Sequence, residues 1–459
     1  MRTNLGNLQR RGPHWWLGAC LALAAALWLG GCEEDGAKKQ SASASSYVAA
    51  GLPDITFGVN GYVHFDIPGI LSQDHAEAMA IQPDGKIVLA GWVTNSSPFL
   101  NDIAVARVHP DGTVDGTFGN HSGAFVFDFD NGNDRAHAVA IQADGKIVVA
   151  GEVANSVSGN QDLIVMRLDT NGSIDTSFAT GGLYVSDGDA GYSSDDAGKG
   201  IAVDSQQRIV VVGQSYSAPS DVDAMVWRFD STGTLDGNFN GSGMQQSGLV
   251  GAEAGNAVAI EPITDNVVMA GSSFGGTIVP TIWRFLGIDG QPDTNFDSDG
   301  WQDLFNATGG ATDTFNAVLI EPNGNIVAAG ASLQGSTTDA GVVWRVLPNG
   351  QPDTSFGAGS SRTVLGGSGV RRVWGVARDG SGNYYLCGEG PGGSSDMYLW
   401  RITPAGTLDP AFVAGVGYFF DGGSGADLGS ACKVDGTGNI VVAGSRVHAT
   451  SDLALWRFF

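Results

Sequence analysis

The chain has 459 residues, of which 70 are glycine and only 15% are charged. This glycine content is about twice the usual share and disfavours helical repeat folds, because glycine destabilises helix interiors. Asp and Glu number 48 against 23 Lys and Arg, a net charge of −25. The chain therefore lacks the basic surface with which proteins bind nucleic acids, and we expect no nucleic-acid partner.

Residues 1–31 have the pattern of a secretory signal peptide. Arg2, Arg10 and Arg11 precede an apolar run from Trp15 to Leu29, and no acid interrupts it. The run is shorter than the roughly 20 residues that a transmembrane helix needs. The sequence that ends at Cys32 (LGGC) resembles the bacterial lipobox, which implies that the Cys32 thiol carries a lipid and begins the mature protein. An ordinary signal peptide with an incidental cysteine is the alternative.

Residues 32–51 are rich in Ser, Ala and Gly, and they predict a flexible tether between the lipid and the folded body, residues 52–459. Removal of residues 1–31 makes the net charge −28, and anionic headgroups repel such a surface. We therefore expect contact with the membrane through the lipid alone. Glu33 does not match the inner-membrane retention signal of some lipoproteins. This favours a cell-envelope protein of the outer membrane, facing the periplasm or the surface.

The body consists of seven copies of one unit. A D-x-x-F element recurs at intervals of 61, 60, 61, 57, 60 and 56 residues. Its copies are Asp54/Phe57, Asp115/Phe118, Asp175/Phe178, Asp236/Phe239, Asp293/Phe296, Asp353/Phe356 and Asp409/Phe412. A second element, AIQPDGKIVLAG at Ala80 to Gly91, recurs as AIQADGKIVVAG and in looser copies. Such regular repetition indicates a repeat fold.

Each unit contains four short strand signals. In the first unit they lie at Tyr62 to Asp66, Ala76 to Ile81, Lys86 to Gly91 and Ile103 to Val108. A Pro-Asp-Gly turn joins two of them, and such turns form antiparallel hairpins. Four antiparallel strands repeated seven times predict an all-β, seven-bladed β-propeller, with the small Ala-x-Ala strand innermost. The chain ends on a third-strand signal, so we expect the N-terminal strand to complete the last blade and close the ring.

A third element places an arginine at the end of an apolar strand in every unit. These residues are Arg107, Arg167, Arg228, Arg284, Arg345, Arg401 and Arg457. Asp of the next D-x-x-F element follows eight residues later in five of six internal cases and nine residues later in the other. Only Arg457 and Asp54 remain unmatched, at opposite ends of the chain. We therefore predict seven structural Arg–Asp pairs, the last of which closes the ring.

The units resemble delta-60 repeats, an uncharacterised bacterial β-propeller repeat family. The resemblance covers Asp54 to Phe459 and is strongest in the first two units. It implies a propeller fold outside the cytoplasm, and it implies no reaction.

Two further sets of repeated residues suggest either packing or binding. Five tryptophans directly precede the repeated arginines: Trp227, Trp283, Trp344, Trp400 and Trp456. Adjacent residues of a strand point to opposite faces, so we expect packing between blades rather than an exposed platform for a sugar or peptide. Acids also precede the innermost strand, at Asp74, Asp134, Asp196, Glu253, Asp313 and Asp427. Two interpretations remain open for these acids. They either have a structural role, as turn caps or partners of the repeated arginines, or they form a ring that attracts a cation.

The sequence offers one weak metal site and one cysteine pair. Asn295, Asp297 and Asp299 are spaced like the start of a calcium loop, but Asn306 stands where that loop needs Glu. Calcium is thus the only cofactor suggested, and no cofactor is firmly implied. Cys387 and Cys432 are the only cysteines of the body, and either a single disulfide or two buried thiols is consistent with an oxidising compartment.

No catalytic motif is evident, so we assign no catalytic residue. The leading hypothesis is a monomeric binding or scaffold module for an envelope protein or a glycan. Its site is expected in the variable loops that follow the strands ending at Gly91 and Gly151, which are Trp92 to Asn101 and Glu152 to Gln161. The alternative is a glycan hydrolase or lyase with carboxylates in the axial pocket. A passive structural protein is the third possibility.

Overall fold

The computed structural model describes most of the repeat region. The described residues are 50–67, 73–94, 100–156, 159–192, 194–219, 221–249, 251–274, 276–304, 313–334, 338–365, 371–390, 396–421, 425–447 and 451–459. The expected signal peptide, Cys32 and all of the tether except Ala50 and Gly51 lie outside them. The part described contains no helix that is long and apolar enough to cross a membrane.

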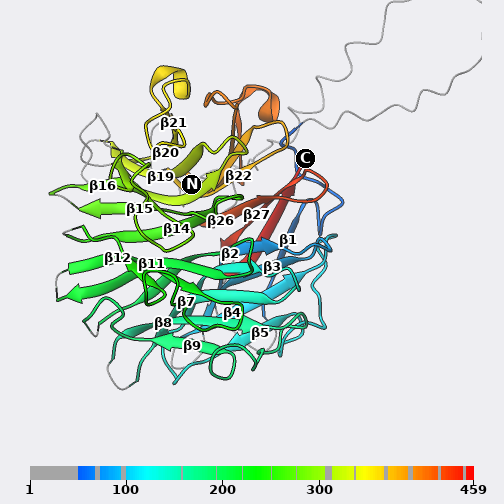
Figure 1. The fold of residues 1–459 in the computed structure, drawn as a ribbon. Helices are drawn as coiled ribbons and strands as arrows, with labels where there is room; N and C mark the ends of the chain where they lie inside the picture. Colours follow the sequence, from blue (N-terminus) through cyan, green and yellow to red (C-terminus); the bar gives the residue numbers. More distant parts are fainter. Residues whose placement is uncertain are drawn as a thin grey trace, which may run out of the picture. The chain divides into compact units, whose positions relative to one another are not determined.

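The fold is a seven-bladed β-propeller of four-stranded antiparallel sheets, as the repeat pattern predicts (Figure 1). Blade 1 consists of β2 (Asp74–Ile81), β3 (Ile87–Thr94), β4 (Asn101–Val108) and β5 (Ala124–Phe127). Blade 2 consists of β6 (Arg135–Ile141), β7 (Ile147–Ala154), β8 (Gln161–Leu168) and β9 (Leu183–Ser186). Blade 3 consists of β10 (Ala197–Val203), β11 (Ile209–Ala218), β12 (Asp221–Phe229) and β13 (Met244–Gln246).

The next three blades repeat this order. Blade 4 consists of β14 (Ala254–Ile260), β15 (Val267–Phe274), β16 (Ile278–Phe285) and β17 (Trp301–Asp303). Blade 5 consists of β18 (Asp313–Ile320), β19 (Ile326–Gln334), β20 (Thr338–Val346) and β21 (Arg362–Leu365). Blade 6 consists of β22 (Arg372–Arg378), β23 (Tyr384–Gly390), β24 (Asp396–Ile402) and β25 (Tyr418–Phe420). Two short 3-10 segments, Gly357–Gly359 and Phe412–Gly415, are the helical elements of the described residues.

Blade 7 combines both ends of the described chain. Its strands are β26 (Asp427–Val434), β27 (Ile440–Val447) and β28 (Ser451–Phe458), and β1 (Tyr62–Phe65) pairs with β28 as the outermost strand. In Figure 1 the blue β1 lies beside the red C-terminal strands. The backbone N–H of Gly51 also donates to the carbonyl of Phe459 at 2.7 Å. Closure by the N-terminal strand is therefore confirmed.

The strand order gives the propeller two different faces. Because neighbouring strands are antiparallel, the turns between first and second strands share one end of the sheets with the loops between third and fourth strands. We call this end the clasp face. The loops between second and third strands, and the links to the next blade, lie at the other end, the loop face. The first strands of successive blades contact one another around the axis.

Apolar packing joins each blade to the next. Seven buried clusters fill the junctions between neighbouring blades, and each contains residues of both. The five repeated tryptophans are between 0% and 8% exposed and contribute to five of these clusters. Trp227 of blade 3, for example, packs with Val148 and Val165 of blade 2. The prediction that these residues pack between blades is confirmed, and they form no exposed platform.

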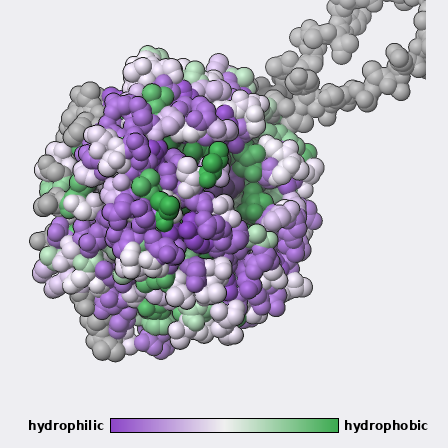
Figure 2. Space-filling view, in the orientation of Figure 1, coloured by the Kyte–Doolittle hydropathy of each residue, from purple (hydrophilic) through white to green (hydrophobic). Residues whose placement is uncertain are grey.

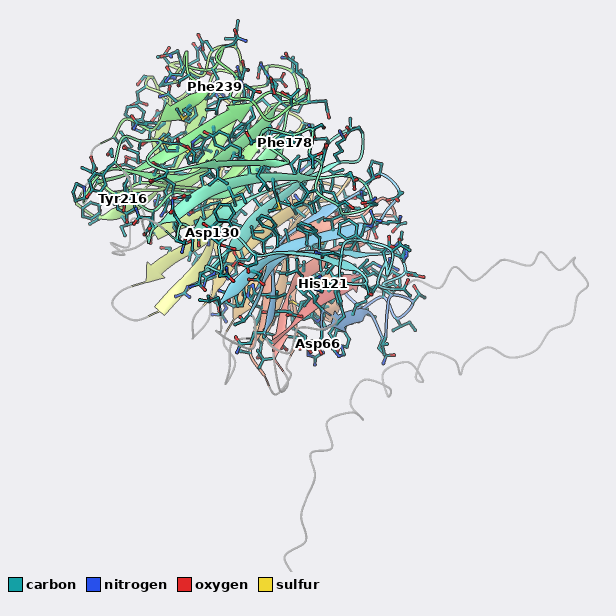
Figure 3. The ribbon with its side chains drawn as sticks, turned by 90° about the horizontal axis from the view of Figure 1, so that it is seen from below. Asp66, His121, Asp130, Phe178, Tyr216 and Phe239 are labelled. Carbon is teal, nitrogen blue, oxygen red and sulfur yellow. The ribbon has the colours of Figure 1, made fainter. Side chains whose placement is uncertain are left out.

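The repeated arginines connect the blades on the clasp face. In all seven pairs expected from the spacing, arginine Nε donates to Oδ2 of the aspartate at 2.7–2.9 Å. Each guanidinium carbon also lies 4.4–4.9 Å from the ring centre of the buried D-x-x-F phenylalanine. Phe178 and Phe239, labelled in Figure 3, are two of these rings. We call each Arg–Asp–Phe group a clasp.

Six clasps also reach the following blade directly. Arg228 Nη1, for example, donates to the carbonyl of Gly287 in blade 4 at 2.5 Å. The last clasp pairs Arg457 with Asp54 at 2.8 Å, and its Nη1 donates to the carbonyl of Pro110 in blade 1 at 2.5 Å. The two ends of the described chain are thus held to each other and to the first blade.

Loss of one clasp arginine should destabilise the propeller by about 3 kcal/mol, because it leaves a buried carboxylate without its counter-charge. We expect this for Arg457→Gln, whose partner Asp54 is 2% exposed and has no other Lys or Arg nitrogen within 4 Å among the described residues. The double variant Arg457→Gln/Asp54→Asn should recover part of the loss. Urea unfolding of the variants, with the exposed Lys433→Gln as control, measures the effect. A loss no larger than that of the control would contradict the role of the clasp.

Candidate functional site

The innermost strand of every blade contains a β-bulge at the same position. The register of the first strand against the second shifts by one residue there, so one residue is left unpaired. The seven bulge residues are Glu77, His137, Lys199, Asn256, Asn316, Trp374 and Ser430. They occupy equivalent positions in their blades, and yet their side chains differ. They are a carboxylate, an imidazole, an ammonium group, two amides, an indole and a hydroxyl.

A glycine in the second strand makes each bulge possible. A Cβ atom on this glycine would lie 1.7–2.0 Å from a carbonyl oxygen of the first strand, which is impossible without a backbone shift. The glycines are those that end the second repeat element: Gly91, Gly151, Gly213, Gly271, Gly330, Gly388 and Gly444. The repeated Ala-Gly of the sequence therefore has a structural cause, which is the bulge opposite it.

The seven bulge residues line one pocket on the propeller axis. The pocket has a volume of about 290 Å³, and His75 and Leu428 complete its lining. It lies in the half of the innermost strands that begins at the loop face. In Figure 2, most of the visible surface is hydrophilic or intermediate, and hydrophobic residues form small separate groups. A recess with convergent polar groups is therefore a better candidate site than this outer surface.

Charged groups from blades 1 to 3 meet on one side of the pocket. His137 Nδ1 lies 3.2 Å from Glu77 Oε2, and His137 Nε2 lies 3.3 Å from Glu152 Oε2. Lys199 Nζ donates to Glu152 Oε2 at 3.1 Å and lies 2.9 Å from His137 Nε2. Trp92 Nε1 donates to the second oxygen of Glu77 at 3.2 Å. The cluster therefore sets the two carboxylates against Lys199 and His137.

These contacts shift the pKa values of the cluster. Burial alone would raise the pKa of Glu77, but the hydrogen bond and charge of His137 lower it to about 2. The pKa of Glu152 is likewise about 2, because His137 and Lys199 outweigh its burial. Burial opposes the charge of His137, but hydrogen bonds to Glu152 and Glu77 raise its pKa above the ordinary value. Both carboxylates are therefore ionised throughout the neutral range.

The other side of the pocket is uncharged. Asn256 Nδ2 donates to the carbonyl of Phe315 at 2.9 Å, and Asn316 Nδ2 donates to the carbonyl of Val373 at 2.9 Å. Each amide thus anchors itself to the next blade through its nitrogen and retains its Oδ1 as an acceptor. Trp374 Nε1 and Ser430 Oγ are shielded from solvent and have no hydrogen-bond partner in the part of the chain that is described. A polar ligand that reaches them would supply one.

The sequence did not identify this ring. It identified the Ala-x-Ala strands as innermost, but alternation alone does not show that the middle residue is a bulge. One signal was available in the sequence. The residue at the bulge position differs from blade to blade, whereas its neighbours in the innermost strand vary little. The predicted loop site is also smaller than expected, because Trp92–Thr94 belong to β3 and Glu152–Ala154 to β7. Residues 95–99, 157 and 158 of those loops lie outside the described residues.

The weak calcium candidate at Asn295, Asp297 and Asp299 stays a prediction, and all three side chains have partners within the protein. Asn295 Nδ2 donates to Asp293 Oδ1 at 3.1 Å, because this position completes the turn of a clasp. Asp297 accepts from the amide of Gln351, and Asp299 Oδ1 accepts from the backbone of Trp301. Among the described residues, the carboxylates whose oxygens converge within 4.8 Å are instead those of Asp102, Asp128 and Asp134.

The cysteine alternatives resolve in favour of two thiols. Cys387 on β23 and Cys432 on β26 are free and buried in the cluster between blades 6 and 7. The Cys432 thiol donates a hydrogen bond to the carbonyl of Tyr385, with an Sγ–O distance of 3.5 Å. Burial raises the pKa of the Cys387 thiol well above its usual range, which disfavours the reactive thiolate. The possible disulfide is therefore not the arrangement of this structure.

Replacement of a bulge-supporting glycine should disturb the pocket and the fold together. We expect Gly271→Ala to lower the free energy of unfolding by about 2–3 kcal/mol, because its Cβ would overlap the Ala254 carbonyl. Gly237→Ala is the matched control, since no heavy atom lies within 4 Å of its Cβ position. Chemical denaturation measures both, and equal stability of the two variants would contradict the steric role of Gly271.

Comparison with known proteins supports the repeat assignment. Four segments, residues 82–118, 142–178, 321–356 and 380–412, match the model of a family described as "Domain of unknown function (DUF5122) beta-propeller". Each segment runs from the end of an innermost strand to the phenylalanine of a clasp. No curated protein matches the chain significantly.

Solved structures with a similar fold have little sequence in common with this chain. A protein of unknown function from Dyadobacter fermentans is 12% identical with a TM-score of 0.46, covering 87% of this chain and 99% of its own. The polysaccharide lyase Uly1 is 8% identical with a TM-score of 0.45, covering 88% and 92%. The β-propeller domain of the Trilobed protease from Pyrococcus furiosus is 11% identical with a TM-score of 0.40, covering 84% and 94%.

These comparisons assign no activity to this chain. Four of its units match the model of a β-propeller family, and its seven four-stranded sheets form a seven-bladed propeller.

Proposed function

We propose that the protein is a binding module whose axial pocket takes an uncharged, polar ligand of the glycan class. The observation that carries this proposal is the ring of seven different residues at one equivalent position. Residues that serve only the fold are the same in every blade, as the clasps are. A position that varies while its backbone stays constant is free to serve recognition.

The charge balance of the pocket favours an uncharged ligand. Glu77 and Glu152 are paired with His137 and Lys199, so the pocket does not present an isolated charge to a ligand. An ionic ligand would have to break one of these contacts and leave a buried charge unpaired, which is costly. A ligand with hydroxyl or amide groups can bind beside them without that cost.

The uncharged side has the groups that saccharides use. Trp374 offers an aromatic side chain and an unpaired Nε1, while Asn256 and Asn316 offer amide oxygens to hydroxyl donors. The volume of about 290 Å³ is near the lower end of ligand pockets and suits a single sugar residue at the end of a chain. We therefore favour a terminal residue of an envelope glycan over an internal segment.

The location proposed for this module is the cell envelope. The basic and apolar residues 1–31, and the sequence LGGC that ends at Cys32, support a lipid anchor followed by a tether. The excess of acids supports a body that contacts the membrane through this lipid alone and is monomeric. An outer-membrane position brings the pocket within reach of envelope glycans.

The pocket is less suited to glycan hydrolysis. A glycoside hydrolase needs one carboxyl group that remains protonated near neutral pH. The pKa of each pocket carboxylate, Glu77 and Glu152, is instead lowered to about 2. Product formation from a bound saccharide would nevertheless revive the enzyme hypothesis, so binding experiments should also analyse the ligand afterwards.

A glycan array probed with the full-length mature protein tests the proposal. We expect binding to uncharged saccharides, and we expect Trp374→Ala to weaken it more than tenfold because an aromatic contact and a donor are lost. Trp301→Ala, on the outermost strand of blade 4, is the matched control and should bind as the parent does. Preference for acidic glycans, or equal loss in both variants, would contradict the proposal.

A further inference from the structure

One nitrogen atom of the axial pocket has two neighbours that require opposite protonation states. His137 Nε2 lies 2.9 Å from Lys199 Nζ and 3.3 Å from Glu152 Oε2. An ammonium group only donates, so a hydrogen bond from Lys199 requires Nε2 to be without a proton. An ionised carboxylate only accepts, so a hydrogen bond to Glu152 requires Nε2 to carry one. The two contacts therefore cannot be hydrogen bonds at the same time.

The distances fit a neutral imidazole. Of the two contacts of Nε2, the shorter is the one with Lys199. In this form the single ring proton lies on Nδ1, which is 3.2 Å from Glu77 Oε2 and donates to it. Lys199 also donates to Glu152 Oε2 at 3.1 Å. Each charged side chain of the cluster thus has a partner, and His137 connects them without a charge of its own.

Protonation of His137 changes both the contacts and the charge of this cluster. A proton on Nε2 makes this nitrogen a donor to Glu152, and it repels the ammonium group of Lys199. Lys199 can turn away from the ring while it keeps its contact with Glu152, which releases one of its three N–H donors. Two carboxylates and one ammonium group carry a net charge of −1, and a charged imidazole brings it to zero.

The pKa values of the cluster leave His137 as the group that titrates near neutral pH. Glu77 and Glu152 have pKa values of about 2 and stay ionised. Burial opposes a charge on His137, but hydrogen bonds to the two carboxylates raise its pKa above the ordinary value. His75 is the other histidine of the lining. It stacks on Trp92 with ring centres 5.2 Å apart, and burial lowers its pKa.

The strands packed against His137 place three charged side chains beside its ring. They are Glu77 on β2, Glu152 on β7 and Lys199 on β10. Arg135, on the same strand as His137, is directed toward Trp92, whose ring centre lies 5.7 Å from its guanidinium carbon. On β4, Arg107 belongs to a clasp and Asp102 lies with other acids on the loop face. The pocket residues from blades 4 to 7 are uncharged.

We propose, on the basis of the binding function stated above, that His137 and Lys199 couple ligand binding in the axial pocket to the uptake of a proton. When His137 is protonated, Lys199 is released from Nε2 and donates to an uncharged oxygen of the ligand. When His137 is neutral, Nε2 occupies that donor. The side chain of Lys199 is 27% exposed and that of His137 is 10% exposed, so Lys199 is the one that a ligand reaches. His137 is a positioning residue that acts through Lys199.

Linkage fixes the direction of the pH dependence. A ligand that prefers the protonated form binds tightly below the pKa of His137 and loses affinity as the pH rises through that pKa. The effect is reciprocal: a ligand held about tenfold tighter by the protonated form raises the pKa of His137 by about one pH unit. The ammonium group stays paired with Glu152 in both forms, so the preference for an uncharged ligand is unaltered.

NMR titration of the His137 ring in the full-length mature protein tests the switch without a ligand, and His137→Gln assigns the signal. We expect Lys199→Met to raise the midpoint by about one pH unit, because Nε2 loses a competing donor and a neighbouring positive charge. Glu152→Gln should lower it by about as much, because the imidazolium loses a carboxylate. Lys433→Met, which replaces an exposed lysine outside the pocket, is the control and should leave it unchanged.

A midpoint that neither Lys199→Met nor Glu152→Gln moves would overturn the proposal. If one of the two variants fails to fold, the other decides, because each removes one of the two neighbours that compete for Nε2. An opposite shift in either variant would also contradict the proposed exchange of partners.

Binding to uncharged saccharides that end in glucose, galactose or N-acetylglucosamine, measured at about pH 5.5 and about pH 8.5, tests the coupling itself. We expect the affinity to be about tenfold higher at the lower pH in the parent and in Lys433→Met. The difference should vanish in His137→Gln and in Lys199→Met. Equal affinity of the parent at both pH values would overturn this inference and leave the binding function standing. Binding at neither pH would overturn the binding function and this inference with it.

Discussion

The ring depends on a guanidinium between each pair of blades, which is buried at six of the seven junctions. An arginine at such a place must find partners for its charge and its donors, because burial without them is costly. Each clasp supplies a carboxylate within 2.9 Å and an aromatic face, and six supply a carbonyl of the next blade. The same group closes the ring, where Arg457 and Asp54 join residues more than 400 positions apart.

The clasps and the apolar junctions leave the axis free to differ from blade to blade. Each innermost strand contributes one unpaired residue through a bulge, and the glycine opposite keeps the backbone the same whatever the side chain is. A framework of constant backbone with a variable side chain at one point can place seven different groups around one pocket. The repeated backbone therefore fixes where each pocket side chain stands, and the differences between the seven side chains determine what the pocket can bind.

Much of the framework could be predicted from local patterns. The spacing of Arg and D-x-x-F, and the order of strand signals, led to the blade count, the closure and all seven pairs. The bulge ring could not be found in this way, since a bulge is a change of register that the strand pattern does not mark. Glu152 reaches the ring from a second strand, and only the folded sheet brings it to His137.

The weak calcium candidate illustrates a related limit of sequence spacing. Asn295, Asp297 and Asp299 are spaced like the start of a metal loop, and calcium binding there stays a prediction. Asn295, however, occupies the place of Thr56, Thr117 and Ser177 in other clasps, where the side chain hydrogen-bonds the clasp aspartate. The acids that do converge are separated in sequence, as Asp102 and Asp134 are, and only the junction of two blades unites them.

The central claim is that the clasps carry the fold while the axial ring carries recognition. Saccharide binding by a variant with Asn256, Asn316 and Trp374, the uncharged side of the pocket, all changed to Ser, the residue of blade 7, tests it most directly. We expect binding to be lost while the melting temperature stays within a few degrees of the parent. Retained binding, or unfolding as severe as that caused by a broken clasp, would contradict the claim.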